Sequence, residues 1–266
     1  MLAFAWLAAT AAVAVRQKQF IFKPPVLPEV DRPTSVSHHV RSVVLRAHDD
    51  TRLSGWLLVP VPGAMKCPGV VYFGGRSEEV SWVVRDAARL FPGMAVLACN
   101  YRGYGQSHGI PGEAAMVDDA MMLYDWLAQC PQVDAKQIAV VGRSLGSGIA
   151  LQVAAARSVK SVVLLTPYDS ILAMAQKRFR VLPVSLVLRH RFESTKHALK
   201  VTAPVYVLRA ETDIVVPADH TDKLMKALGS LQAEETISAS NHSTIPYLPL
   251  TQAKIAAFLA HNFTFA

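Results

Sequence analysis

Short apolar runs and longer segments with helical spacing alternate along most of the chain. Apolar runs bounded by turn-forming residues predict strands at 43–45, 53–59, 70–73, 95–99, 138–141, 161–165, 205–208 and 236–237. Apolar residues at helical spacing predict helices at 79–90, 118–128 and 146–156, one ending at 224–228, and a last one containing 255–259. Because strands and helices alternate, we expect a mostly parallel sheet with helices on both faces. The pattern therefore predicts an α/β fold.

A long interruption separates two of the predicted core strands. Residues 167–204 lie between the strands at 161–165 and 205–208, and we interpret them as an inserted helical cap. Within the cap, residues 181–188 form a mainly apolar run bracketed by four arginines: Arg178, Arg180, Arg189 and Arg191. This run fits either a buried cap helix with solvated basic ends or an exposed apolar lip beside a binding site.

The first fifteen residues form an unbroken run of apolar and small residues, which Arg16, Lys18 and Lys23 follow. As a helix, the run reaches only about 22 Å, short of a hydrocarbon core of roughly 30 Å. We interpret residues 1–23 as a short signal-anchor that holds the protein at a membrane, with a cleaved signal peptide and export, or a core helix, as alternatives. The Pro-rich residues 24–39 then predict a linker, and residues 40–266 the folded domain.

Composition excludes several classes of protein. The chain has 266 residues, of which 52% are hydrophobic and 18% charged, so neither a disordered chain nor a nucleic-acid-binding tail protein fits. The net charge of +7 is spread without a run of five like charges. Three cysteines without C-x-x-C spacing give neither a disulfide framework nor a zinc ribbon. Since dinucleotide, Walker and H-E-x-x-H motifs are also missing, we expect no cofactor and no metal.

The strongest chemical signal is the sequence Gly-Arg-Ser-Leu-Gly at residues 142–146. It follows the predicted strand at 138–141 and precedes a predicted helix, which is the context of a nucleophile elbow. A serine on so tight a turn adopts a strained backbone, and small flanking residues avoid collisions with the neighbouring elements. The helix that follows directs backbone N–H groups toward a reacting carbonyl oxygen. We therefore predict Ser144 as a nucleophile.

A serine nucleophile needs a histidine base and a carboxylate that orients it, in the chain order serine, acid, histidine. Asp213 follows the predicted strand at 205–208, where the acid is expected, although it also fits a helix cap. Glu211, two residues closer to the strand, and Asp169, after the preceding strand, are the rival acids.

Among the histidines after Ser144, His242 best fits the base. It lies in a loop after the strand at 236–237 and before the last helix. His220 falls inside a predicted helix and His190 in the cap, so we expect both to be surface residues.

Two backbone N–H groups should stabilise the oxyanion that forms when a serine attacks a carbonyl. One belongs to Leu145, the residue after the nucleophile. The other should come from the loop after the strand at 70–73, which reads Gly74-Gly75-Arg76, and we predict the N–H of Arg76. An ordinary turn at the strand end is the alternative for this loop.

Five motifs in this order resemble the α/β-hydrolase-domain (ABHD-type) serine hydrolases, in particular those with an N-terminal membrane anchor. The motifs are residues 72–75, 100–107, 142–146, 213–217 and 241–242. The resemblance covers about residues 40–263 and implies an eight-stranded sheet, at whose C-terminal edge three side chains converge: Ser144, Asp213 and His242. Where many relatives have His-Gly at the oxyanion loop, this chain has Gly-Gly.

The residues favour a hydrolase of carboxylic esters or thioesters that forms an acyl-enzyme on Ser144. We expect a small-molecule or lipid ester as substrate, and the apolar run of the cap is a lip for its acyl chain unless it is a buried cap helix. We also expect a membrane partner through the N-terminal segment, and no nucleic acid. A serine peptidase or amidase on the same scaffold and a non-catalytic binding scaffold are the alternatives.

Overall fold

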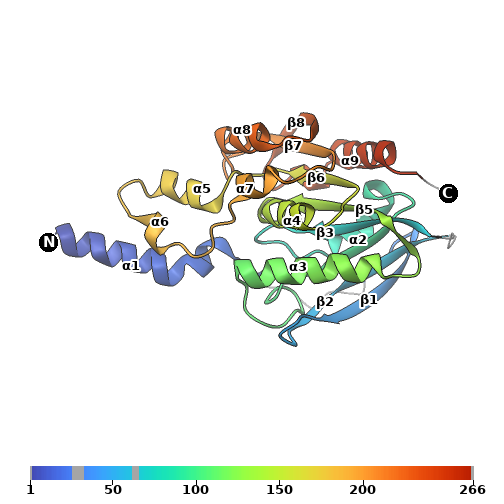
Figure 1. Cartoon of the computed structure of the whole chain (residues 1–266), viewed down its shortest axis with the longest axis horizontal. Coiled ribbons are helices and arrows are strands. Elements are labelled where there is room, and N and C mark those ends of the chain that lie inside the picture. The colour runs from blue at the N-terminus through green and yellow to red at the C-terminus, as the bar shows by residue number, and fades with distance from the viewer. Residues whose placement is uncertain (1, 26–32, 62–65, 265–266) are drawn as a thin grey trace.

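A single mixed sheet runs through the computed structural model, which describes residues 2–25, 33–61 and 66–264 (Figure 1). Its strands are β1 (His38–Arg46), β2 (Arg52–Pro60), β3 (Cys67–Phe73), β4 (Ala95–Cys99), β5 (Val133–Arg143), β6 (Ser161–Leu165), β7 (Val205–Thr212) and β8 (Leu231–Asn241). In space they follow the order β1-β2-β4-β3-β5-β6-β7-β8. β2 pairs antiparallel with β1 and β4, and the remaining neighbours pair in parallel. The predicted eight-stranded, mostly parallel sheet is confirmed.

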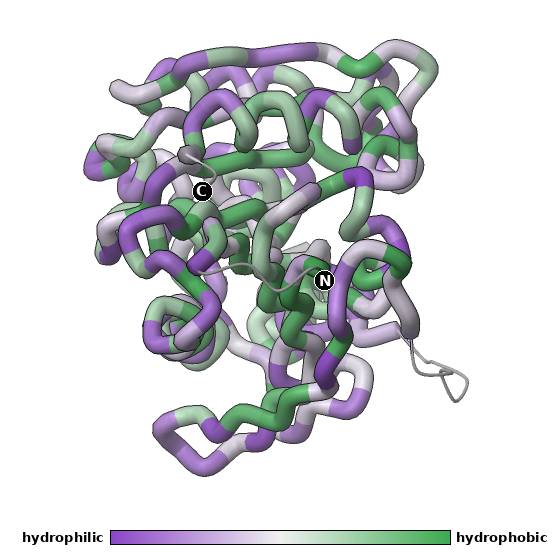
Figure 2. The backbone as a smooth tube through the Cα atoms, turned by 90° about the vertical axis from the view of Figure 1, so that its right-hand side faces the viewer, coloured by the Kyte–Doolittle hydropathy of each residue, from purple (hydrophilic) through white to green (hydrophobic). Residues whose placement is uncertain are grey.

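Helices cover both faces of this sheet. α3 (Glu113–Ala128), α4 (Leu145–Ala156) and α8 (Ala218–Ala227) pack on one face, and α2 (Trp82–Leu90) and α9 (Pro249–Asn262) on the other. Successive residues of the central strands enter opposite cores, and each strand is therefore apolar on both faces. Figure 2 shows hydrophobic segments running through the centre of the molecule. Full burial of each such valine or leucine contributes roughly 1.5–3 kcal/mol.

The predicted cap segment contains three short helices between β6 and β7: α5 (Ile171–Arg178), α6 (Val184–Val187) and α7 (Ser194–Ala198). Its apolar run is not one buried helix. Val184 and Leu188 are buried, whereas Val181 and Leu186 are 79% and 82% exposed. Only the one-turn helix α6 follows Pro183, and the run presents apolar side chains both inward and outward.

The N-terminal segment is a helix, α1 (Leu2–Ile21), that lies along the cap (Figure 1). The indole nitrogen Nε1 of Trp6 donates to the carbonyl oxygen of Val181 at 2.6 Å. The buried Gln17 donates from Nε2 to the carbonyl oxygen of Val187 at 3.2 Å. The segment that we interpreted as an anchor therefore contacts the folded domain through its own side chains.

None of the helices that the structure describes is long and apolar enough to cross a membrane. The physical reason lies in residues 16–19, Arg-Gln-Lys-Gln, which occupy the last part of α1 and leave about fifteen apolar residues before them, fewer than the ~20 of a span. The predicted membrane-anchored localisation is therefore wrong, and a membrane partner through this segment is not supported. The boundaries at residues 23 and 39 stay predictions, and residues 26–32 of the predicted linker lie outside the described residues.

Candidate active site

Ser144 occupies a strained turn between β5 and α4. Its backbone has φ of 50° and ψ of −116°, outside the regions that side-chain-bearing residues normally adopt. The turn is crowded, because a Cβ on Gly146 would lie 2.1 Å from the carbonyl oxygen of Phe73, and one on Gly142 would lie 2.4 Å from that of Gly146. The two glycines of the motif are thus required by packing. The strained turn holds the Ser144 side chain at the C-terminal edge of the sheet.

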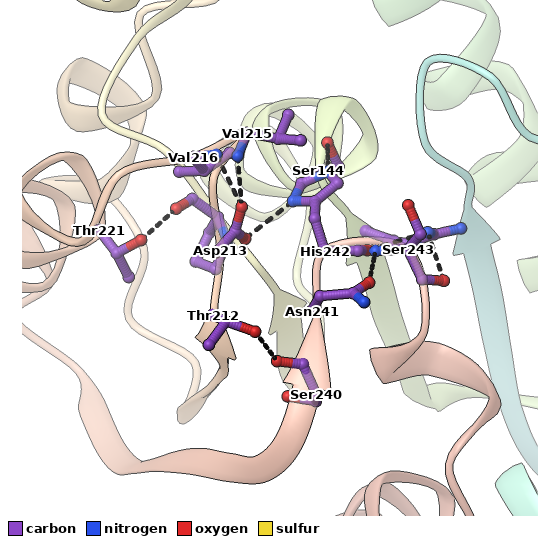
Figure 3. A network of polar contacts seen from close by, with 12 residues as sticks. Ser144, Thr212, Asp213, Val215, Val216, Thr221, Ser240, Asn241, His242 and Ser243 are labelled. Atoms are coloured by element: carbon purple, nitrogen blue, oxygen red, sulfur yellow. Dashed lines mark hydrogen bonds and ion pairs between the residues drawn. The ribbon is translucent and has the colours of Figure 1, made fainter.

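The structure brings together the three side chains that the sequence predicted (Figure 3). The ring nitrogen Nε2 of His242 lies 2.9 Å from Oγ of Ser144, and Nδ1 lies 2.8 Å from Oδ2 of Asp213. The Asp213 and His242 side chains are only 10% and 13% exposed. This chain of two hydrogen bonds has the geometry in which an imidazole removes a serine proton while a carboxylate orients the ring.

The Asp213 carboxylate is held by its own loop. Its Oδ1 accepts hydrogen bonds from the backbone N–H groups of Val215 at 2.9 Å and Val216 at 2.8 Å (Figure 3). Because Oδ1 is engaged with the backbone, Oδ2 is directed to His242. The loop thus fixes the orientation of the Asp213 carboxylate without any contribution from His242.

The rival residues make other contacts. The exposed Glu211 accepts from the backbone N–H of Ala239 at 2.8 Å. Asp169 is bonded through Oδ1 to Nδ1 of His220 at 2.7 Å. Neither rival acid bonds to His242. His220 is 1% exposed, so the expectation of a surface residue is wrong; α8 turns it inward onto the loop after β6. His190, half-buried in the cap, accepts from the N–H of Glu113.

The predicted oxyanion donors border the same space as Ser144. A Cβ on Gly75 would lie 3.7 Å from Cβ of Ser144, so the loop after β3 passes close to the serine. The N–H of Gly75 is used by Glu78, whereas the N–H of Arg76 has no hydrogen-bond partner among the described residues. Leu145 is the first residue of α4, and N–H groups at this position have no partner within a helix.

Sequence reasoning missed a buried acid beside this loop. The Glu78 carboxylate accepts four hydrogen bonds of 2.7–2.8 Å, from Tyr72 Oη, Gly75 N, Trp82 Nε1 and Arg143 Nη1. Its side chain is 3% exposed. A carboxylate with four donors is fully satisfied, so Glu78 fixes the oxyanion loop in one conformation.

Arg143, the residue before the nucleophile, connects Glu78 to the histidine loop. Its Nη2 donates to the carbonyl oxygens of His242 at 3.1 Å and Ser243 at 3.3 Å. Burial favours a lower pKa for the Arg143 guanidinium, but Glu78, Tyr72 and Tyr247 together outweigh it and the pKa is raised. Arg143 is therefore charged and joins the oxyanion loop, the elbow and the histidine loop. No sequence motif relates Glu78 to Arg143, which lie 65 residues apart.

Two pockets meet at Ser144. A pocket of about 320 Å³ is lined mainly by polar side chains, among them Glu78, Arg143 and His242. A second pocket, of about 290 Å³, is lined mainly by apolar side chains of α1, α5 and the loop after β7. Both border Ser144, so a substrate on the serine can extend in two chemically different directions.

The geometry defines a class of protein. A mostly parallel eight-stranded sheet with a strained serine between a strand and a helix is the α/β-hydrolase fold. An acetyl xylan esterase from Paenibacillus sp. R4 has a similar structure, with a TM-score of 0.70 at 20% identity, covering 94% of this chain and 92% of that one. At this identity the similarity shows the fold alone.

Sequence comparison narrows the class to a family. The dienelactone hydrolase family matches residues 102–242, and the chain belongs to this family. An uncharacterized protein of Mycobacterium tuberculosis is 30% identical over 229 residues, which cover 86% of this chain and 81% of that protein. The lysophosphatidylserine lipase ABHD12 of Danio rerio is 28% identical over 183 residues, which cover 60% of this chain and 45% of the lipase. The chain is therefore a hydrolase of this type, and the predicted resemblance to α/β-hydrolase-domain proteins is confirmed without its membrane anchor.

Proposed function

We propose that the protein is a serine hydrolase that cleaves carboxylic esters or thioesters through an acyl-enzyme on Ser144. The observation that carries the proposal is the chain of hydrogen bonds from Ser144 Oγ through His242 to Asp213, at 2.9 and 2.8 Å. The family and the strained elbow support the same conclusion. The lipase activity of the relative ABHD12, a lysophosphatidylserine lipase, supports fatty acyl esters among the substrates.

In the proposed mechanism, His242 Nε2 removes the proton from Ser144 Oγ as it attacks the carbonyl carbon. Asp213 keeps the proton of the ring on Nδ1 and stabilises the imidazolium that forms. The N–H groups of Leu145 and Arg76 stabilise the negative charge on the carbonyl oxygen.

His242 then gives the proton to the leaving oxygen or sulfur, and the alcohol or thiol departs. In the second half of the reaction His242 removes a proton from water, the hydroxide attacks the acyl-enzyme, and Ser144 recovers its proton as the acid is released. All atoms and protons balance without a cofactor.

A comparison of paired substrates tests this proposal. We expect turnover of nitrophenyl esters and acyl thioesters, and much slower turnover of the matching aminoacyl nitroanilides. Faster cleavage of the amides would favour the peptidase alternative. No turnover of any of them, together with no labelling by a fluorophosphonate probe, would favour a non-catalytic binding scaffold.

A further inference from the structure

The two pockets beside Ser144 differ in which catalytic group they reach. His242 lines the polar pocket together with Ser243 and Tyr247. The apolar pocket reaches Ser144 and Leu145 but does not include His242. The polar pocket thus contains His242, the proton donor, and the apolar pocket does not.

Because the two pockets differ, each is suited to a different half of an ester substrate. The leaving oxygen must receive a proton from His242 Nε2, so the leaving group has to lie on the histidine side of Ser144. The acyl group then extends into the opposite, apolar pocket. Substrates that fit have a polar alcohol or thiol and an apolar acyl chain.

The apolar pocket is built in part by the N-terminal helix. Phe20 and Ile21 from the last turn of α1 line it together with Met174 and Ala175 of α5. The end of α1 is tied to the oxyanion loop by two hydrogen bonds: Arg76 Nη1 donates to the carbonyl oxygen of Phe20 at 3.0 Å, and the Lys23 N–H donates to that of Arg76 at 2.9 Å. The position of this wall is therefore coupled to the reacting centre.

The size of the pocket limits the chain it can hold. Its volume is about 290 Å³, many times the roughly 10–15 Å³ that a single water-sized group needs in a cavity. A medium-length chain fills the pocket, and an acetyl group leaves most of it empty.

We infer that the last turn of α1 and the inner side of α5 form an acyl-binding pocket that selects esters of medium-length apolar acids over acetyl esters. This inference rests on the proposed function and specifies its substrate class. It assigns α1 a role as a wall of the substrate site.

Two pairs of variants of the full chain test the pocket. Ala175→Phe fills it from α5, and Ala173→Phe is the matched control, because Ala173 is half-buried on the same helix but does not line it. Phe20→Ala removes part of the α1 wall, and Phe4→Ala is its control near the exposed start of α1. The quantity measured is the ratio of kcat/KM on nitrophenyl octanoate to kcat/KM on nitrophenyl acetate.

We expect the native enzyme to prefer octanoate. The ratio should fall at least fivefold in Ala175→Phe and Phe20→Ala and stay within twofold in both controls. A smaller fall in Ala175→Phe, or an equal fall in its control, would overturn the inference. If the native enzyme hydrolyses neither ester, the proposed function fails.

A binding measurement tests the acyl pocket independently of substrate turnover. Decanoate should bind to Ser144→Ala in calorimetric titrations, and the affinity should fall at least fivefold when Ala175→Phe is added. Absence of decanoate binding, or binding that Ala175→Phe leaves unchanged, would reject the acyl pocket. Thermal unfolding of each variant establishes that the proteins compared are folded.

Discussion

At the scale of single residues, the site depends on orientation. Ser144 is positioned by a strained backbone, and two backbone N–H groups hold the Asp213 carboxylate that bonds to the histidine. Two other acids lie within the same part of the sequence, but Glu211 bonds to Ala239 and Asp169 to His220. The contacts of each carboxylate, and not its residue type, separate the candidate from its rivals.

The first prediction concerns the acid. Asp213→Asn should lower kcat by roughly 10⁴, because the amide no longer holds the productive His242 tautomer. Glu211→Gln should leave kcat within a few-fold of native. Asp169→Asn should act mainly on stability, since its partner is the buried His220. Steady-state kinetics on one ester and thermal unfolding decide between them, and a larger loss of kcat in either rival would contradict the assignment.

The second prediction concerns pH and His38. Burial lowers the pKa of His38 below its ordinary 6.5, and the neutral ring bonds through Nε2 to the carbonyl oxygen of Met94 at 3.0 Å. The unfolded chain therefore binds more protons than the folded protein as pH falls through about 6.5. We expect the free energy of unfolding to decrease between pH 7.5 and 5.5.

His38→Gln should make this decrease shallower, because glutamine keeps a donor for Met94 and does not titrate. His39→Gln, at the exposed neighbouring position, is the control. Urea unfolding at the two pH values gives the slopes, and equal slopes for native protein and His38→Gln would contradict the expected contribution.

At the scale of elements, one ion pair connects three loops. Glu78 holds the loop after β3, and Arg143 connects it to the elbow and to the carbonyl of His242. Both charges are almost completely buried, with side chains 3% and 10% exposed. Removal of one partner leaves an uncompensated charge in the interior, which is much more costly than the loss of an exposed pair.

The third prediction follows from this pair. Glu78→Gln should lower the free energy of unfolding by about 3–5 kcal/mol, because the Arg143 charge loses its partner. Glu193→Gln, which breaks the exposed pair with Lys196, should cost less than about 1 kcal/mol. Chemical denaturation of both variants measures the two losses of unfolding free energy. Equal losses would contradict a larger contribution from the buried Glu78 pair.

At the scale of the whole molecule, the sequence predicted what depends on local pattern. Apolar runs gave the strands, and the motif at 142–146 led to Ser144 because a nucleophile elbow has a local signature. Asp213 and His242 could be placed because each follows a strand at the same edge of a parallel sheet. The oxyanion loop was placed by its position after the strand at 70–73, and the number of strands came from the family resemblance.

What the pattern could not give depends on tertiary contacts. An apolar run does not reveal whether lipid or protein covers it, so α1 was assigned to a membrane although Trp6 and Gln17 bond to the cap. The pair of Glu78 and Arg143 and the burial of His220 arise from residues far apart in sequence. These contacts become visible only when the elements are assembled.

The central claim is that Ser144 is the nucleophile, and covalent labelling tests it most directly. The native protein should react with a fluorophosphonate probe, and mass spectrometry of its peptides should find the adduct on Ser144 alone. Ser144→Ala should remain folded, take up no label and lose ester turnover by several orders of magnitude. An adduct on another residue, or more than a tenth of native turnover in Ser144→Ala, would contradict the account.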